Sequence, residues 1–271
     1  MRYRVDTVPL PVRIVYVALS WTCGLVFFVY YWICRVTSEI SIAGPGKRDL
    51  SQHAIFCLWH ESWWPYFVAF LRFRSPHAIM SHPAAYMKPV HVVFRLMGGK
   101  MLLLGSSGDE GKLAADALAW FVHEGHSTTI SPDGPHGPAR VLKKGVLHIA
   151  AQSGVPIVPL SIASARYLPL PTWDSKRIPL PFNRIVVTVH EAVPVTLGNF
   201  QEASARIVGA LARSTSGPSR PIVAATVVGL TVVRRDHAPR YCGSARGCRD
   251  PASESAPVRS RARTDRSACA R

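Results

Sequence analysis

The stretch Ser131-Pro-Asp-Gly-Pro-His-Gly-Pro138 decides how the rest of the chain is interpreted. It follows an apolar run that ends at Ile130 and precedes an amphipathic run that begins at Val141. Three prolines and two glycines exclude a helix or a central strand, because proline lacks an amide donor and glycine lacks rigidity. We predict a stiff turn between a strand and a helix, where Asp133, His136 and free amides can face a ligand. The alternative is an ordinary tight turn.

Alternating apolar and amphipathic runs surround this turn and predict the fold class. Strand-like runs lie at 53–59, 78–81, 100–104, 127–130, 155–162 and 184–190. Helix-like runs lie at 61–73, 86–97, 109–124 and 142–153. Such alternation predicts an α/β fold in which a mixed sheet is flanked by helices on both faces.

A long apolar run lies near the N-terminus. Residues 14–34 contain no charged side chain over 21 positions, which is enough for a helix to cross a hydrocarbon core of about 30 Å. Arginines flank the run, and Trp21 and Trp32 are aromatics of the kind found at membrane interfaces. A cleavable signal peptide is the alternative, but no small-residue cleavage site follows. We expect an uncleaved membrane anchor, either spanning the bilayer or lying partly in one leaflet.

Composition divides the chain into four segments. We expect a membrane anchor at 1–36, a linker at 37–52, an α/β domain at 53–200 and a poorly ordered basic tail at 201–271. The linker prediction rests on a Gly-Pro-Gly sequence that breaks helices. The tail is rich in Arg, Ser, Ala and Pro, a composition typical of disorder, although its first residues, 201–213, can form a helix.

The net charge of +16 predicts an anionic partner, either nucleic acid or an anionic membrane surface. A hydrophobic content of 48% favours the membrane. The tail carries 13 arginines, but no aromatic residue follows Tyr241 to stack on bases, so we expect no nucleic-acid partner. None of the six cysteines forms a Cys-x-x-Cys pair, so neither a metal site nor a disulfide framework is expected.

His60 is the first candidate for chemistry. It follows an apolar strand and opens a helical run, and such a junction lies at the carboxyl edge of a sheet, where ligands bind. A histidine pKa near neutrality suits a general base. The alternative is a structural histidine that caps the helix or bonds a backbone carbonyl.

Four blocks of sequence carry a family resemblance. They are Trp59-His-Glu61, Leu104-Gly-Ser-Ser107, Ser131-Pro-Asp-Gly-Pro135 and Val155-Pro-Ile-Val-Pro159. Their order resembles the four motifs of the glycerolipid acyltransferases. The chain is similar in particular to the bacterial branch known as the DUF374 type, whose third motif reads Pro-Asp-Gly-Pro-x-Gly-Pro. The resemblance covers roughly residues 40–195 and includes the later Trp173-Asp174 pair.

The resemblance implies transfer of an acyl chain from acyl-CoA or acyl carrier protein to a hydroxyl of a lysolipid or similar membrane lipid. His60 would act as the general base, and Asp133 would orient the acceptor hydroxyls or His60. The family places an orienting aspartate five residues after the histidine, but this chain has Pro65 there. A catalytically degenerate member that binds lipid is therefore the first alternative, and a basic nucleic-acid-binding protein, suggested by the net charge alone, is the second.

The resemblance also implies a substrate-binding set. Hydroxyls of the second block would hold a phosphate or a headgroup, or cap the following helix. Basic residues of the third block and of the helix after it would bind the donor. The members of the set are Ser106, Ser107, Gly134, Pro135, His136 and Arg140. No cofactor besides the acyl donor is expected, and the predicted location is the cytoplasmic membrane with the catalytic domain facing the cytosol.

Overall fold

The structure of the protein is a computed structural model that describes residues 8–73, 75–105 and 109–212. Ser106 and Ser107, and the predicted tail beyond residue 212, lie outside the described residues.

The described chain alternates strands and helices, as the sequence pattern predicts. The strands are β1 (Glu39–Ala43), β2 (Ile55–Cys57), β3 (His77–Ser81), β4 (Met101–Leu104), β5 (Ser127–Ile130), β6 (Ile157–Ser164), β7 (Tyr167–Pro169), β8 (Arg177–Pro179) and β9 (Arg184–Val189). The α-helices are α1 (Leu10–Thr37), α2 (Trp63–Ala69), α3 (Lys88–Leu96), α4 (Asp109–His123), α5 (Gly145–Ser153) and α6 (Phe200–Ala212). Short 3₁₀ turns are η2 (Pro45–Ser51), η3 (His60–Ser62) and η4 (Ala85–Met87).

Seven of the strands form one mixed sheet in the order β1-β9-β6-β2-β5-β3-β4. Strands β6, β2, β5, β3 and β4 run parallel to one another, whereas β9 is antiparallel to β6 and parallel to β1. The carboxyl ends of the five parallel strands therefore meet at one edge of the sheet. β7 and β8 pair with each other in a separate hairpin.

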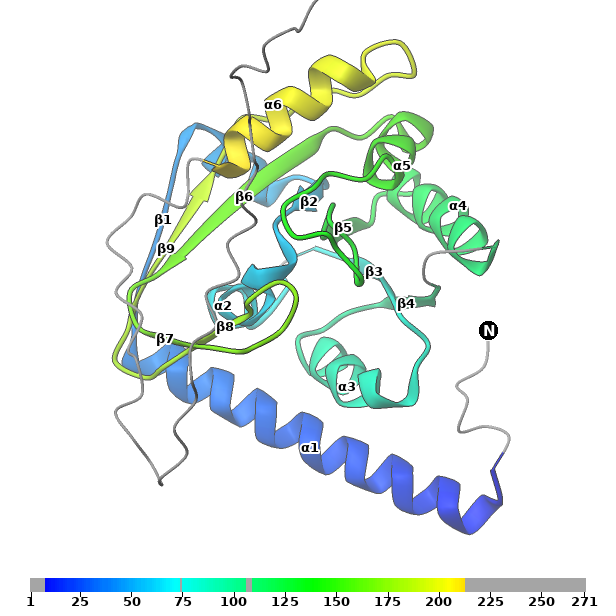
Figure 1. The fold of residues 1–271 in the computed structure, drawn as a ribbon, viewed down its shortest axis with the longest axis vertical. Helices are drawn as coiled ribbons and strands as arrows, with labels where there is room; N and C mark the ends of the chain where they lie inside the picture. Colours follow the sequence, from blue (N-terminus) through cyan, green and yellow to red (C-terminus); the bar gives the residue numbers. More distant parts are fainter. Residues whose placement is uncertain (1–7, 74, 106–108, 213–271) are drawn as a thin grey trace, which may run out of the picture. The chain divides into compact units, whose positions relative to one another are not determined.

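Helices cover both faces of this sheet (Figure 1). Side chains alternate along a strand, so Ile55 and Cys57 of β2 pack into a core with α4, α5 and α6. Phe56 and the following Leu58 pack into a second core with α1, α2 and α3. The expected α/β class, with a mixed sheet flanked by helices, is confirmed.

The expected linker at 37–52 is wrong, because it contains β1. This strand pairs in parallel with β9, from Glu39 opposite Arg184 to Ala43 opposite Thr188. Its exposed and half-buried residues alternate, as expected of an edge strand with one covered face. The alternating pattern of β1 is only five residues long and directly follows the much longer apolar helix α1, so the sequence gives little sign of a separate strand.

The helix that the sequence allows at 201–213 is present, so the predicted boundary between the domain and a poorly ordered tail at residue 200 is wrong. α6 extends to Ala212 and packs on β6. Ala203, Ile207 and Leu211 recur at intervals of four residues, so they share one helix face, and each is buried in the core. Residues 201–212 therefore belong to the α/β domain.

α1 lies against the domain along much of its length. The Tyr30 hydroxyl donates to the carbonyl of Pro179 at 2.7 Å, and the Arg35 guanidinium donates to the carbonyl of Ala69 at 2.8 Å. A Cβ on Gly24 would lie 2.6 Å from Val92 of α3, so the glycine permits close helix packing.

The side of α1 away from the domain is apolar and exposed. This surface, the α1 apolar face, includes Val15, Leu19, Val26, Trp32 and Val36. By length and composition the helix is sufficient to cross a membrane.

Candidate functional site

Three segments converge at the carboxyl edge of the parallel strands. His60 follows β2, the turn at 131–140 follows β5, and a loop at 170–176 joins β7 to β8 after β6. β2 lies between β5 and β6 and runs parallel to both, so the topology brings these segments to the same place. Ligand crevices form at such edges in α/β proteins.

Asp133 joins the first two segments. Its carboxylate is 1% exposed and accepts hydrogen bonds from the backbone amides of His60, at 3.1 Å, and Arg140, at 3.2 Å. Burial raises the pKa of this carboxyl, and the hydrogen bonds from the amides oppose the rise. His60 and Asp133 lie together as expected, but the carboxylate of Asp133 bonds the backbone amide of His60 and not its ring.

The ring of His60 is held by the third segment. Its Nδ1 lies 2.6 Å from Oδ2 of Asp174, and the indole of Trp173 stacks on it with ring centroids 5.2 Å apart. The His60 side chain remains 20% exposed. In the described part of the chain, no hydrogen bond involves Nε2 of His60. This nitrogen can therefore serve a ligand.

Asp174 is buried, and both oxygens of its carboxylate have hydrogen-bond or ion-pair partners. The Thr172 hydroxyl donates to Oδ1 at 2.7 Å, and the Lys176 ammonium lies 2.9 Å from the carboxylate. Burial alone would raise the pKa of Asp174, but hydrogen bonds from His60, Lys176 and Thr172 outweigh it and hold the pKa below its usual value. The carboxylate is therefore ionised at neutral pH.

The pKa of His60 is lowered. Burial is the main cause, and the positive charge of Lys176 acts in the same direction, whereas Asp174 and Asp133 act in the opposite one. The imidazole is therefore neutral at pH 7, with the Nδ1 proton facing Asp174 and a lone pair on Nε2. Such a group can accept a proton from a hydroxyl.

The loop at 170–176 can lie over the turn because residue 137 is glycine. Gly137 has φ +66°, and a Cβ there would lie 2.6 Å from Cε3 of Trp173. The family resemblance includes the Trp173-Asp174 pair but implies no role for Asp174. No spacing rule could find it, since 114 positions separate it from His60.

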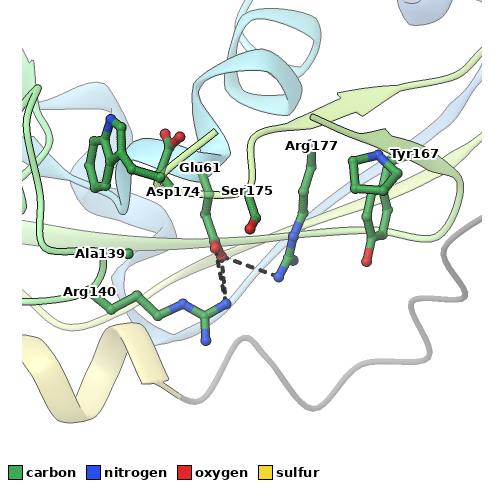
Figure 2. A pocket seen from close by; sticks show the side chains of 9 residues that line it. Glu61, Ala139, Arg140, Tyr167, Asp174, Ser175 and Arg177 are labelled. Carbon is green, nitrogen blue, oxygen red and sulfur yellow. Dashed lines mark hydrogen bonds and ion pairs between the residues drawn. The ribbon is translucent and has the colours of Figure 1, made fainter. Parts of the chain in front are cut away.

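Glu61 has a different set of partners from its neighbour His60. Its buried carboxylate accepts two hydrogen bonds of 3.0 Å from Nη2 of Arg140 and lies 3.3 Å from Nη2 of Arg177 (Figure 2). These side chains border an open hollow of about 310 Å³ beside Asp174. The lining residues are Glu61, Ala139, Arg140, Tyr167, Pro169, Trp173, Asp174, Ser175 and Arg177. Arg140 is the member of the expected substrate-binding set that lines this hollow.

Three further residues of the expected set lie on the turn but outside the hollow. Gly134 has φ +66°, and Pro135 and His136 are exposed. The ring of His136 lies 6.0 Å from that of His82, which follows β3. Ser106 and Ser107 are outside the described residues, and the amide of the preceding Gly105 bonds the carbonyl at the end of β3.

Position 65 supplies no carboxylate to this edge. Pro65 lies in α2 and is buried. Among the described residues, no group of three or more His, Cys, Asp or Glu side chains is arranged to hold a metal ion.

The chain is similar to one curated protein in sequence, and solved structures also align with it. No protein-family model matches the chain. The uncharacterized protein RP090 of Rickettsia prowazekii (strain Madrid E) is 26% identical over 174 residues, which cover 61% of this chain and 79% of that protein. Among solved structures, the 1-acyl-sn-glycerophosphate (LPA) acyltransferase PlsC from Thermotoga maritima aligns with a TM-score of 0.45 and 16% identity. That alignment covers 74% of this chain and 81% of PlsC.

Proposed function

We propose that the protein is a membrane-associated acyltransferase. It moves an acyl chain from acyl-CoA or acyl carrier protein to the hydroxyl of a lysolipid or a related membrane lipid. The observation that carries this proposal is the 2.6 Å contact between Nδ1 of His60 and Asp174, at the sheet edge that also bears the 131–140 turn. The order of the four sequence blocks, which resembles that of glycerolipid acyltransferases, supports the same reaction.

The proposed reaction begins with proton transfer. Nε2 of His60 takes the proton of the lipid hydroxyl as the oxygen attacks the carbonyl carbon of the thioester. A new C–O bond forms, the C–S bond breaks, and the departing thiolate receives the proton from the imidazolium. The products are the acylated lipid and the free thiol of the carrier. Asp174 stabilises the imidazolium that forms in between, since its carboxylate faces Nδ1.

We further propose that α1 lies in the plane of the membrane and does not cross it. Its contacts with Val92, Ala69 and Pro179 hold the helix against the domain. A crossing helix would have to leave these contacts or draw the domain into the lipid. The α1 apolar face would enter one leaflet, as amphipathic interfacial helices do. The site would then face the lipid acceptor from the cytosolic side.

The direct test compares two histidine variants of the full chain in lipid vesicles. Transfer of a labelled acyl group from acyl-CoA, or from acyl carrier protein, to lysophospholipid is measured by mass spectrometry. General base catalysis contributes about 10²- to 10⁴-fold, so His60→Ala should lower the rate by that amount. His53→Ala alters an exposed histidine just before β2 and should leave the rate unchanged.

The catalytically degenerate alternative predicts a different result. The unmutated protein would bind vesicles that contain lysolipid but form no acylated product from either donor. A wild-type rate equal to that of His60→Ala would overturn the proposed function.

A further inference from the structure

We infer that Asp174 is the positioning residue for His60, supplied by the β7–β8 loop in place of a carboxylate at position 65. The inference rests on the proposed acyl transfer, because positioning matters only if His60 acts as a base. It goes beyond the family resemblance, which places the orienting acid five residues after the histidine, where this chain has Pro65.

The geometry favours Asp174 over the other nearby carboxylates. Asp133 already accepts two backbone amides, and Glu61 is engaged by two guanidiniums. Asp174 has Oδ2 at 2.6 Å from Nδ1 of His60, the short distance of a charge-assisted hydrogen bond. An acceptor at Nδ1 fixes the proton there, which leaves Nε2 as the basic nitrogen.

The surrounding loop is built to keep this carboxylate charged and in place. Thr172 and Lys176 both bind it, and the Lys176 ammonium lies 5.7 Å from the centre of the Trp173 ring. Trp173 in turn stacks on His60. One short loop therefore provides the acceptor, its counter-ion and an aromatic wall for the imidazole.

The first experiment measures steady-state acyl transfer by the full chain in vesicles. Asp174→Asn keeps the size of the side chain but removes the charge, and we expect kcat to fall by about 10²- to 10⁴-fold with little change in KM. Asp116→Asn is the matched control, since Asp116 is exposed on α4 and bonds only Gln152 among the described contacts. A kcat for Asp174→Asn within twofold of the control would overturn the inference.

The second readout is the acidic limb of the pH–rate profile, which a purely structural residue would not move in this way. The charged groups around His60 are Asp133, Asp174, Lys176 and the ion-paired Glu61. Asp174 raises the pKa of His60, so Asp174→Asn should move the limb to lower pH. Lys176 lowers that pKa, so Lys176→Met should move the limb to higher pH. Shifts in the same direction, or no shift, would contradict the assignment.

The third readout does not require turnover. Nitrogen NMR of ¹⁵N-histidine-labelled protein reports which ring nitrogen of His60 carries the proton. We expect the Nδ1–H form in the unmutated protein and a mixture of forms in Asp174→Asn. If the wild type shows the Nδ1–H form but transfers no acyl group, the proposed function fails, while the contact by which Asp174 fixes the proton on Nδ1 of His60 stands. If Asp174→Asn keeps the same form, the positioning role fails.

Discussion

At the scale of residues, two buried carboxylates of the site have opposite pKa shifts. Burial dominates for Asp133 and raises its pKa, whereas three donors lower the pKa of Asp174. The hydrogen bonds that Asp133 accepts from backbone amides lower its pKa less than burial raises it, whereas the side chains of His60, Lys176 and Thr172 together outweigh burial at Asp174. Asp133 therefore fixes the backbone of the site, and Asp174 is the carboxylate whose ionised form is favoured by its own partners.

The surroundings of His60 and His77 show which features of a single residue the sequence can predict. A histidine after an apolar strand points to His60 from sequence alone. Its contact with Asp174 depends on a hairpin far along the chain. The sequence also gives no sign that His77 is buried between Phe56 and Phe73, since that stack depends on tertiary packing.

His77 makes stability depend on pH. Burial, with a contribution from the charge of His126, lowers the pKa of His77 to about 3. His77 therefore takes up a proton near pH 6.5 in the unfolded chain but only near pH 3 in the folded chain. Because the unfolded chain binds more protons between these values, the free energy of unfolding falls as the pH falls from about 6.5 to about 3. His77→Gln removes the titration, and the loss of unfolding free energy from pH 7 to pH 4 should shrink by about 2–3 kcal/mol.

Urea unfolding of the detergent-solubilised protein at several pH values measures this effect. His53→Gln changes an exposed histidine and should leave the pH dependence as it is in the wild type. Equal pH dependence in the wild type and His77→Gln would show that His77 does not contribute.

At the scale of elements, long periodic segments are predictable and short ones are not. The predicted helix at 109–124 matches α4 within one residue, and the predicted strand at 184–190 matches β9 within one residue. β7 and β8 are three residues each and both end at proline, so they carry no strand pattern of their own. They form by pairing with each other, and the loop between them brings Asp174 to the site.

Gly137 tests whether this loop must rest on the turn. Gly137→Ala places a Cβ 2.6 Å from Trp173 and at a positive φ. The backbone strain alone costs about 1–2 kcal/mol. A displacement of the catalytic geometry by about 1 Å can cost 10²-fold, so we expect a loss of acyl transfer of that order.

Gly145→Ala is the matched control for this variant. Gly145 begins α5, and no atom lies within 4 Å of its added Cβ. The control should be as active as the wild type and as stable or more so, because alanine favours a helix. Full activity of Gly137→Ala would show that Trp173 does not need this close packing.

At the scale of the whole molecule, the apolar run near the N-terminus is visible in sequence, but its relation to the domain is not. A run of this length is compatible with crossing or with lying in one leaflet. Gly24 and the contacts of Tyr30 and Arg35 support the in-plane arrangement that we propose, and they depend on partners far along the chain.

Depth measurements test the in-plane arrangement. Val15 and Val36 are both exposed on the α1 apolar face and are separated by about 32 Å along the helix axis. Nitroxide labels at these positions, in a background without accessible cysteines, should lie at similar shallow depths in vesicles. A label at the exposed Gln152 of α5 should remain in water. Labels near opposite surfaces would instead indicate a crossing helix.

The central claim is that neutral His60 removes the proton from a lipid hydroxyl. The most direct measurement is the rate of acyl transfer by the full chain in vesicles as a function of pH. Because burial lowers the pKa of His60, the rate should rise along an acidic limb with an apparent pKa below the usual histidine value of about 6.5. The residual rate of His60→Ala should lack that limb. A limb above 6.5, or the same limb in His60→Ala, would contradict the account.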